Sequence, residues 1–144
     1  MPLYEPEYTP STGGNTLQTL FTQLTSDTST TSTTLVNLIS QNITTSSGSF
    51  VDVGFSVAAS ATTANEHLNF VLLIDGVTTS RGTNIRNGAA NVSEAGVILY
   101  RATGLSATAH TFTIQWAIVT TGTAQIRAAT SNIEHCSLFL EEKI

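Results

Sequence analysis

Charged side chains are scarce in this sequence. They make up 10% of its 144 residues, against about 25% in a typical soluble domain. Basic residues are scarcer than acidic ones. No Lys or Arg occurs before Arg81, whereas acidic residues occur throughout that first half. Binding to nucleic acid needs clustered cations that neutralise phosphates, so this charge distribution argues against a nucleic-acid partner.

Cysteine and long apolar runs are also nearly absent. Cys136 is the only cysteine, which excludes an intrachain disulfide. It stands in an apolar segment, where we expect a small buried side chain rather than a reactive thiol. No run of about 18 apolar residues is present, and the first residues lack the features of a secretory signal, so we expect no membrane partner.

Residue types that carry out catalysis or bind metals do not form a recognisable set. The sequence lacks a G-x-S-x-G motif, a glycine-rich phosphate loop and a Cys-x-x-Cys pair. His135 and Cys136 are neighbours, but consecutive strand residues point to opposite faces and cannot readily share one ion. Asp52 and Asp75 would form a carboxylate pair only if the fold brought them together. We expect no enzyme activity, catalytic residue, metal site or cofactor.

The clearest positive pattern is an alternation in residues 109–119. Its large side chains fall on every second position, at Phe112, Ile114, Trp116 and Ile118. A period of two over ten residues that are rich in aromatic and β-branched types is typical of a half-buried β-strand. We therefore predict a long central strand here and interpret the other strands as its neighbours.

Several other segments have the character of strands. A strong turn signal at Asp75-Gly76 predicts a hairpin, and the last strand predicted closes the chain. The predicted strand segments are 35–43, 50–59, 67–74, 77–80, 97–100, 109–119, 123–128 and 133–140. About eight strands without an internal helix predict an all-β domain over residues 34–144, an antiparallel two-sheet sandwich of the jelly-roll type.

The first 33 residues differ from this domain and are predicted to form an attachment segment. Prolines recur every four residues around Tyr4 and Tyr8, which predicts an extended arm because proline fixes φ and removes backbone donors. A disordered tail is the alternative. Tyrosines in such an arm offer a large contact area with a polar tip, as a docking peptide needs.

A short helix is predicted after the arm. Its apolar residues have the spacing i, i+3, i+4, i+7 of one helix face, and they are Leu17, Leu20, Phe21 and Leu24. Such a short helix would be unstable alone in water, so its apolar face must be buried against this domain, another copy or another protein. The Ser/Thr-rich run at 26–34 predicts a linker between the helix and the β-domain.

One polar segment, residues 81–93, is predicted to be a long loop with one short strand at most. Its candidate recognition residues are Arg81, Asn84, Arg86, Asn87 and Asn91. Asparagine and arginine hydrogen-bond readily to sugar hydroxyls, although the segment has no aromatic ring to stack on a sugar. An ordinary solvent-exposed loop is the simpler alternative.

Three pieces of the sequence together resemble a known family. These are NFVLLIDGV at 69–77, the turn TGLSA at 103–107 that leads into HTFTIQW at 110–116, and the closing apolar strand. In this order they resemble small jelly-roll modules of bacteriophage virions, which are similar to the trimeric tumour-necrosis-factor/C1q-type domain. The resemblance covers about residues 34–142. It departs from the family at Thr108-Ala109, where the family turn carries Gly-Ser, and at His135 and Cys136.

The resemblance implies a non-enzymatic, homotrimeric structural protein located on the virion. Our leading hypothesis is a capsid decoration (cement) protein that docks on the surface of the phage head and stabilises the shell. Its partner would be the major capsid protein or another virion protein. The capsid anchor would comprise Tyr4, Tyr8, Leu17, Leu20, Phe21 and Leu24.

Two alternatives to decoration remain. The chain would otherwise be the receptor-binding tip module of a phage fibre or spike, with residues 81–93 contacting a host glycan. It would also suit a general trimerisation module of a larger particle.

Overall fold

The computed structural model describes residues 14–144, which form ten β-strands and no helix. This part of the chain therefore has no helix that could span a membrane. The strands are β1 (Thr16–Gln23), β2 (Thr28–Thr30), β3 (Val36–Thr44), β4 (Phe50–Ala61), β5 (Glu66–Ile74), β6 (Val77–Asn87), β7 (Glu94–Ala102), β8 (Ala109–Ile118), β9 (Ala124–Ile126) and β10 (His135–Lys143).

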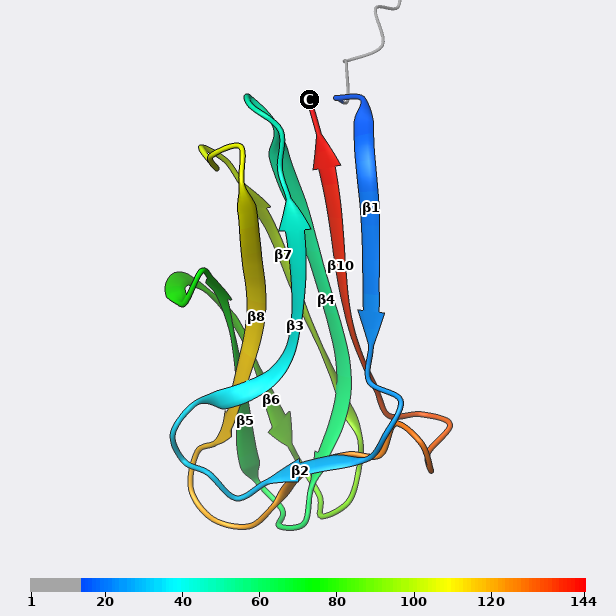
Figure 1. The fold of residues 1–144 in the computed structure, drawn as a ribbon. Coiled ribbons are helices and arrows are strands. Elements are labelled where there is room, and N and C mark those ends of the chain that lie inside the picture. Colours follow the sequence, from blue (N-terminus) through cyan, green and yellow to red (C-terminus); the bar gives the residue numbers. More distant parts are fainter. Residues whose placement is uncertain (1–13) are drawn as a thin grey trace, which may run out of the picture.

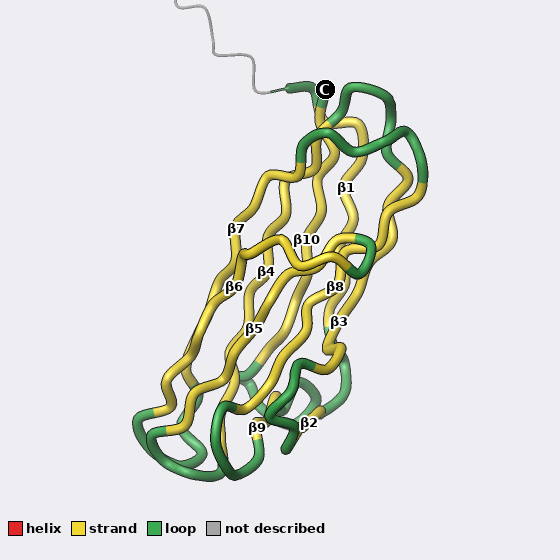
Figure 2. The backbone as a smooth tube through the Cα atoms, turned by 90° about the vertical axis from the view of Figure 1, so that its left-hand side faces the viewer, coloured by secondary structure: helices red, strands yellow, loops and turns green. Residues whose placement is uncertain are grey.

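The strands form two antiparallel sheets that face each other (Figures 1 and 2). The larger sheet runs β1-β10-β4-β7, and short strands β9 and β2 extend it beyond the end of β4. The smaller sheet runs β3-β8-β5-β6. The predicted all-β, two-sheet architecture is therefore confirmed.

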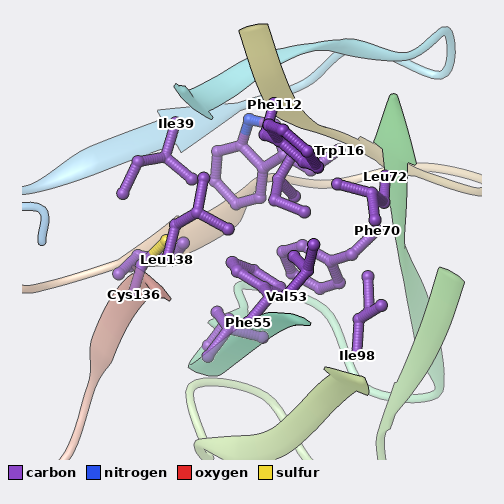
Figure 3. Packing of buried hydrophobic residues seen from close by; sticks show 14 of the residues in the cluster. Ile39, Val53, Phe55, Phe70, Leu72, Ile98, Phe112, Trp116, Cys136 and Leu138 are labelled. Atoms are coloured by element: carbon purple, nitrogen blue, oxygen red, sulfur yellow. The ribbon is translucent and has the colours of Figure 1, made fainter. Parts of the chain in front are cut away.

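The core lies between the two sheets and follows the alternation of each strand (Figure 3). Phe55 comes from β4 in the larger sheet, and its ring centroid lies 5.7 Å from that of Phe70 on β5 in the smaller sheet. The Phe70 ring in turn lies 6.1 Å from that of Trp116 on β8. These three buried aromatic side chains connect the sheets at the centre of the sandwich.

The predicted central strand is confirmed as β8, which lies between β3 and β5 in the smaller sheet. All four of its large alternating side chains, from Phe112 to Ile118, are buried. The hairpin predicted at Asp75-Gly76 also forms, as the turn between β5 and β6. Both turn residues have positive φ, 51° for Asp75 and 78° for Gly76, as a two-residue hairpin of the favoured type requires.

The predicted short helix is wrong, because Thr16–Gln23 is strand β1 at the edge of the larger sheet. It pairs antiparallel with β10 through main-chain hydrogen bonds. When a strand carries large apolar residues on both faces, some of these residues also fall at the i, i+3, i+4 spacing that is typical of one helix face. Here Leu20 points towards the core, while Leu17 and Phe21 are exposed on the opposite face. The β-branched threonines between them favour the extended backbone.

Two neighbouring predictions also need adjustment. The Ser/Thr-rich run predicted as a linker contains β2, which pairs with β9. Both β1 and β2 thus pair with strands that come after residue 34. The segment at 81–93 is a loop only in its second half, because β6 continues through Asn87 and pairs with β5. Asn87 itself is fully buried, and its side-chain amide donates to the Ala61 carbonyl oxygen.

Truncating the central aromatic side chain tests the inter-sheet contact. We expect Phe70→Ala to lower the free energy of unfolding by about 3–5 kcal/mol, because it removes buried area and leaves a cavity between the sheets. Thr113→Ala, on the outward face of β8, serves as the control and should change it by about 0.5 kcal/mol or less. Chemical denaturation monitored by Trp116 fluorescence measures both. Equal effects of the two substitutions would contradict the assigned core.

Candidate functional site

The four predicted anchor residues that the structure describes, Leu17, Leu20, Phe21 and Leu24, do not form one surface. Tyr4 and Tyr8 lie outside the described residues. Leu20 and Leu24 are half-buried against the core, whereas Phe21 is exposed on the outer face of the larger sheet. Leu17 is exposed as well. Strand geometry therefore divides the four residues that a helix would have brought together.

An apolar row crosses the outer face of the larger sheet. The strand register aligns Phe21 on β1 with Phe139 on β10, Phe139 with Gly54 on β4, and Gly54 with Leu99 on β7. Val97, two residues before Leu99 on β7, extends the row along the sheet. The exposed fractions are 60% for Phe21, 37% for Phe139, 76% for Leu99 and 56% for Val97. We call these four side chains the apolar row.

Gly54 makes the apolar row continuous across β4. A Cβ atom at this position would lie 3.8 Å from Phe139 Cβ and 4.0 Å from Leu99 Cδ2. The side chains from the two flanking strands therefore reach over the glycine from both sides. The outward position of Phe139 follows from the alternation of β10, but its place beside Phe21 depends on strand pairing, which the sequence does not reveal.

A compact set of ion pairs borders the apolar row, one register step away. Arg101 makes a two-pronged contact with Asp52, from Nε to Oδ1 at 2.7 Å and from Nη2 to Oδ2 at 2.9 Å. Lys143 Nζ lies 3.3 Å from Asp52 and 2.7 Å from Glu141. The hydrogen bond from Arg101 is the main cause that holds the pKa of Asp52 below its ordinary value. Two carboxylates and two cations leave this charged border with no net charge.

The outer face of the smaller sheet has a different chemistry, built from amides. The register places Ala117 on β8, Asn69 on β5 and Asn84 on β6 in one row. Arg86 pairs with His67 one step further along and is exposed. Of the predicted recognition residues, Asn84 and Arg86 thus lie on this face, and Asn91 lies in the exposed loop before β7. Arg81 is an exposed residue of β6.

The fold also brings together Ser106, His110 and Asp75 in the contact order of a catalytic triad. His110 Nδ1 lies 2.6 Å from Asp75 Oδ2, and Nε2 lies 3.4 Å from Ser106 Oγ. However, Nε2 lies closer, at 3.0 Å, to the main-chain carbonyl oxygen of Ser106. A carboxylate and a carbonyl both accept, so this arrangement favours the imidazolium form of His110, in which both ring nitrogens donate. In that form the ring cannot accept a proton as a general base does.

This cluster instead ties two loops together. Asp75 Oδ1 also accepts from the Thr111 main-chain N–H at 2.8 Å, so the carboxylate holds the β5–β6 turn against β8. The hydrogen bond to Asp75 is the main cause that raises the pKa of buried His110. The same bond is the main cause that lowers the pKa of Asp75. Asp52 is on the other sheet and does not pair with Asp75.

The buried carboxylate of Glu134 joins the segment before β7 to the segment that follows β9, through Ser93 and Arg127. Burial by itself raises the pKa of Glu134, but hydrogen bonds from Arg127 and Ser93 outweigh it and lower the pKa to about 2.

The Cys136 thiol is buried, as predicted, and burial raises its pKa to about 12. A thiol with so high a pKa is a poor nucleophile near neutral pH.

The His110–Asp75 pair predicts a specific pH dependence of stability. The stability that His110 gains from the pair is fully present below the pKa of about 6.5 that the group has in the unfolded chain. This stability is lost as the pH rises through the raised pKa of the folded protein. The contribution from Asp75 is present above about pH 3.9 and is lost as the pH falls through the lowered folded pKa. We expect the wild-type protein to lose more stability between about pH 6 and pH 9 than His110→Gln does.

Urea denaturation midpoints at the two pH values measure this difference. Asp75→Asn should reduce the pH dependence as His110→Gln does, and the double variant should add little to either single substitution, because all three remove the same ion pair. An unchanged pH dependence in His110→Gln would show that the pair does not carry the effect.

Comparisons with known proteins give only distant structural likenesses. No protein-family profile matches the sequence, and no curated protein matches it. Among solved structures, the C-terminal domain of EclA, a sugar-binding protein, aligns over 88% of this chain and 79% of its own, with a TM-score of 0.36 and 14% identity. VP2 in the subviral particle of infectious bursal disease virus aligns over 90% of this chain and 38% of its own, with a TM-score of 0.45 and 11% identity. Likenesses this distant carry no argument about function.

Proposed function

We propose that this chain is a non-enzymatic structural protein of a phage virion, a homotrimer that decorates the capsid surface and stabilises the shell. The observation that carries the proposal is the apolar row on the outer face of the larger sheet. An exposed row that contains two phenylalanines, rimmed by polar side chains, has the composition of an interface core rather than of a solvated surface.

The strand order supports a jelly-roll topology for the domain. Successive long strands cross between the sheets, from β3 to β4 to β5 and again from β6 to β7 to β8. The resulting orders, β1-β10-β4-β7 and β3-β8-β5-β6, are those expected of eight strands wound as two Greek keys. This topology favours the resemblance to phage jelly-roll modules that the sequence motifs suggest.

We infer that the apolar row is covered by copies of this chain. The ion pairs of Asp52, Arg101, Glu141 and Lys143 neutralise one another within each copy. Identical faces can therefore approach without the repulsion that a net charge of -5 per chain would otherwise cause. Removing already paired, partly covered charges from water also costs less than removing free ones. A threefold arrangement closes such contacts into a ring.

The attachment to the shell is assigned to the first residues of the chain. Gly14, where the described residues begin, lies against Ile144 at the end of the sandwich where the chain terminates (Figure 1). Leu20 and Leu24 are half-buried within the sandwich, and Phe21 belongs to the apolar row. Tyr4, Tyr8 and the exposed Leu17 therefore remain as the anchor candidates. Their partner would be the major capsid protein or another virion protein.

The alternative is a receptor-binding module at the tip of a fibre or spike. One observation favours it, namely an open groove in the amide-bearing face of the smaller sheet, next to Asn84. Both functions would use the trimer. Decoration and receptor binding would therefore be distinguished by the location of the protein on the virion and by the ligand of the groove.

A charge placed in the apolar row tests self-association. We expect the wild-type chain to be a trimer in light scattering and Leu99→Asp to be mainly monomeric at the same concentration. A buried, unpaired carboxylate costs several kcal/mol, which weakens assembly by about a hundredfold or more. The matched control is Val77→Asp, at a side chain that is 70% exposed on the β5–β6 hairpin of the other sheet. A wild-type monomer, or a Leu99→Asp trimer, would refute the interface.

Removing the arm alone tests the anchor. We expect a protein lacking residues 1–13 to fold and form trimers, because β1 begins at Thr16, but not to co-sediment with shells of the phage that encodes it. Tyr4→Ala combined with Tyr8→Ala should weaken co-sedimentation in the full-length chain. Undiminished binding of the shortened protein would rule out the arm as the attachment device.

A further inference from the structure

A groove of about 350 Å³ lies in the outer face of the smaller sheet. Its residues come from three neighbouring strands and from the segment before β3. Ala117 on β8 and Gly82 on β6 are the smallest residues that line it, and Leu35 lines it from the segment before β3. Small side chains within a sheet face that otherwise carries longer ones leave this hollow. Its volume is near the lower end of the range for small-molecule sites, about 300–1,000 Å³.

The polar groups of the groove are held in fixed orientations. His67 Nδ1 lies 2.9 Å from Asn84 Oδ1, and Asn84 Nδ2 donates to Asn69 Oδ1. This chain of contacts leaves one N–H of Asn84 and both N–H groups of the Asn69 amide. Within residues 14–144, none of these three donors has an acceptor. Preoriented donors lose little rotamer entropy when a ligand binds.

We propose that this groove binds an uncharged carbohydrate. No Asp, Glu, Lys or Arg lines it, so nothing in the groove itself compensates a ligand charge. The free amide donors and the hydroxyl of Thr33, which also lines it, match the hydroxyl groups of a sugar. Leu35 and Val71 supply aliphatic surface for the C–H face of a sugar ring. The volume suits a single ring or a disaccharide rather than a long chain.

The lack of a stacking ring sets the expected strength of binding. Phe70 is the one aromatic residue that lines the groove, and its ring is buried between the sheets against Phe55 and Trp116. Without a stacking ring, hydrogen bonds and aliphatic contacts provide the affinity, so we expect a dissociation constant on the order of 1 mM for one site. The groove and the apolar row lie on opposite outer faces of the sandwich. A trimer built on the apolar row would therefore display three open grooves, and multivalent contact would raise the apparent affinity.

The groove inference goes beyond the proposed structural function and does not rest on it, because a monomer would carry the same groove. Leu99→Asp separates the two. If self-association through the apolar row is correct, this variant binds a glycan surface more weakly than the wild-type protein while keeping the wild-type affinity for a soluble monovalent glycan. If the trimer interface is wrong but the groove is right, binding of the soluble glycan still depends on Asn84.

The experiment uses the full-length chain on an array of neutral and sialylated glycans. The strongest neutral glycan is then titrated in solution by isothermal calorimetry. We expect Asn84→Ala to weaken binding by about tenfold, because it removes a donor and releases the orientation of Asn69. Leu35→Ala should weaken it less. The matched control is Asn42→Ala, which removes an asparagine on the same sheet that bonds to Thr111 Oγ1 at 2.8 Å, away from the groove.

Three results would overturn the inference. The first is that the wild-type chain binds no glycan on the array. The second is that binding is confined to sialylated glycans and is lost in Arg86→Ala but not in Asn84→Ala, which would place an anion site beside the groove. The third is that Asn84→Ala and Asn42→Ala bind equally well, which would place the sugar elsewhere on the molecule.

Discussion

The contact between the inner faces of the two sheets, centred on Phe55, Phe70 and Trp116, fixes the orientation of every long strand. Because side chains alternate along a strand, the residues committed to this contact determine which ones face outwards. A shift of one residue in β10 would bury Phe139 and expose Cys136 and Leu138. The apolar row and the groove are thus consequences of the same packing constraint, expressed on the two outer surfaces.

The parts of the fold that could be predicted from the sequence are those that depend on the alternation of side chains within a single segment. The inner faces of β4, β8 and β10 were predictable because each has a clear period of two. The helix prediction failed at β1, where apolar residues on both faces, such as Leu20 and Phe21, also fit a helical spacing. Strand pairing is set by the whole chain, so neither the apolar row nor the groove could be located. Asn84 was predicted as a recognition residue from its type, whereas Leu99 and Phe139 were not singled out.

On both outer faces of the sandwich, where charged residues are few, polar side chains are paired with one another. The charged residues that do lie near the apolar row are paired with one another, as Asp52 is with Arg101 and Lys143. Elsewhere amides and hydroxyls bond to each other across strands, as Gln115 does with Asn37. A surface of this kind keeps its polar groups satisfied without strong long-range fields. Contacts made by it depend on shape and short-range hydrogen bonds more than on electrostatic attraction.

Two glycines show how differently the outer faces are determined. At Gly54 an added Cβ would make only ordinary contacts, at 3.8 Å and beyond, so the meeting of Phe139 and Leu99 over it is permitted rather than imposed by the backbone. At Gly82 an added Cβ would lie 2.5 Å from the Phe70 carbonyl oxygen, closer than real Cβ atoms approach. The backbone of the β5–β6 pair therefore forbids any side chain at this point of the groove. The hollow is thus built into the sheet itself, whereas the apolar row depends on which side chains occupy its positions.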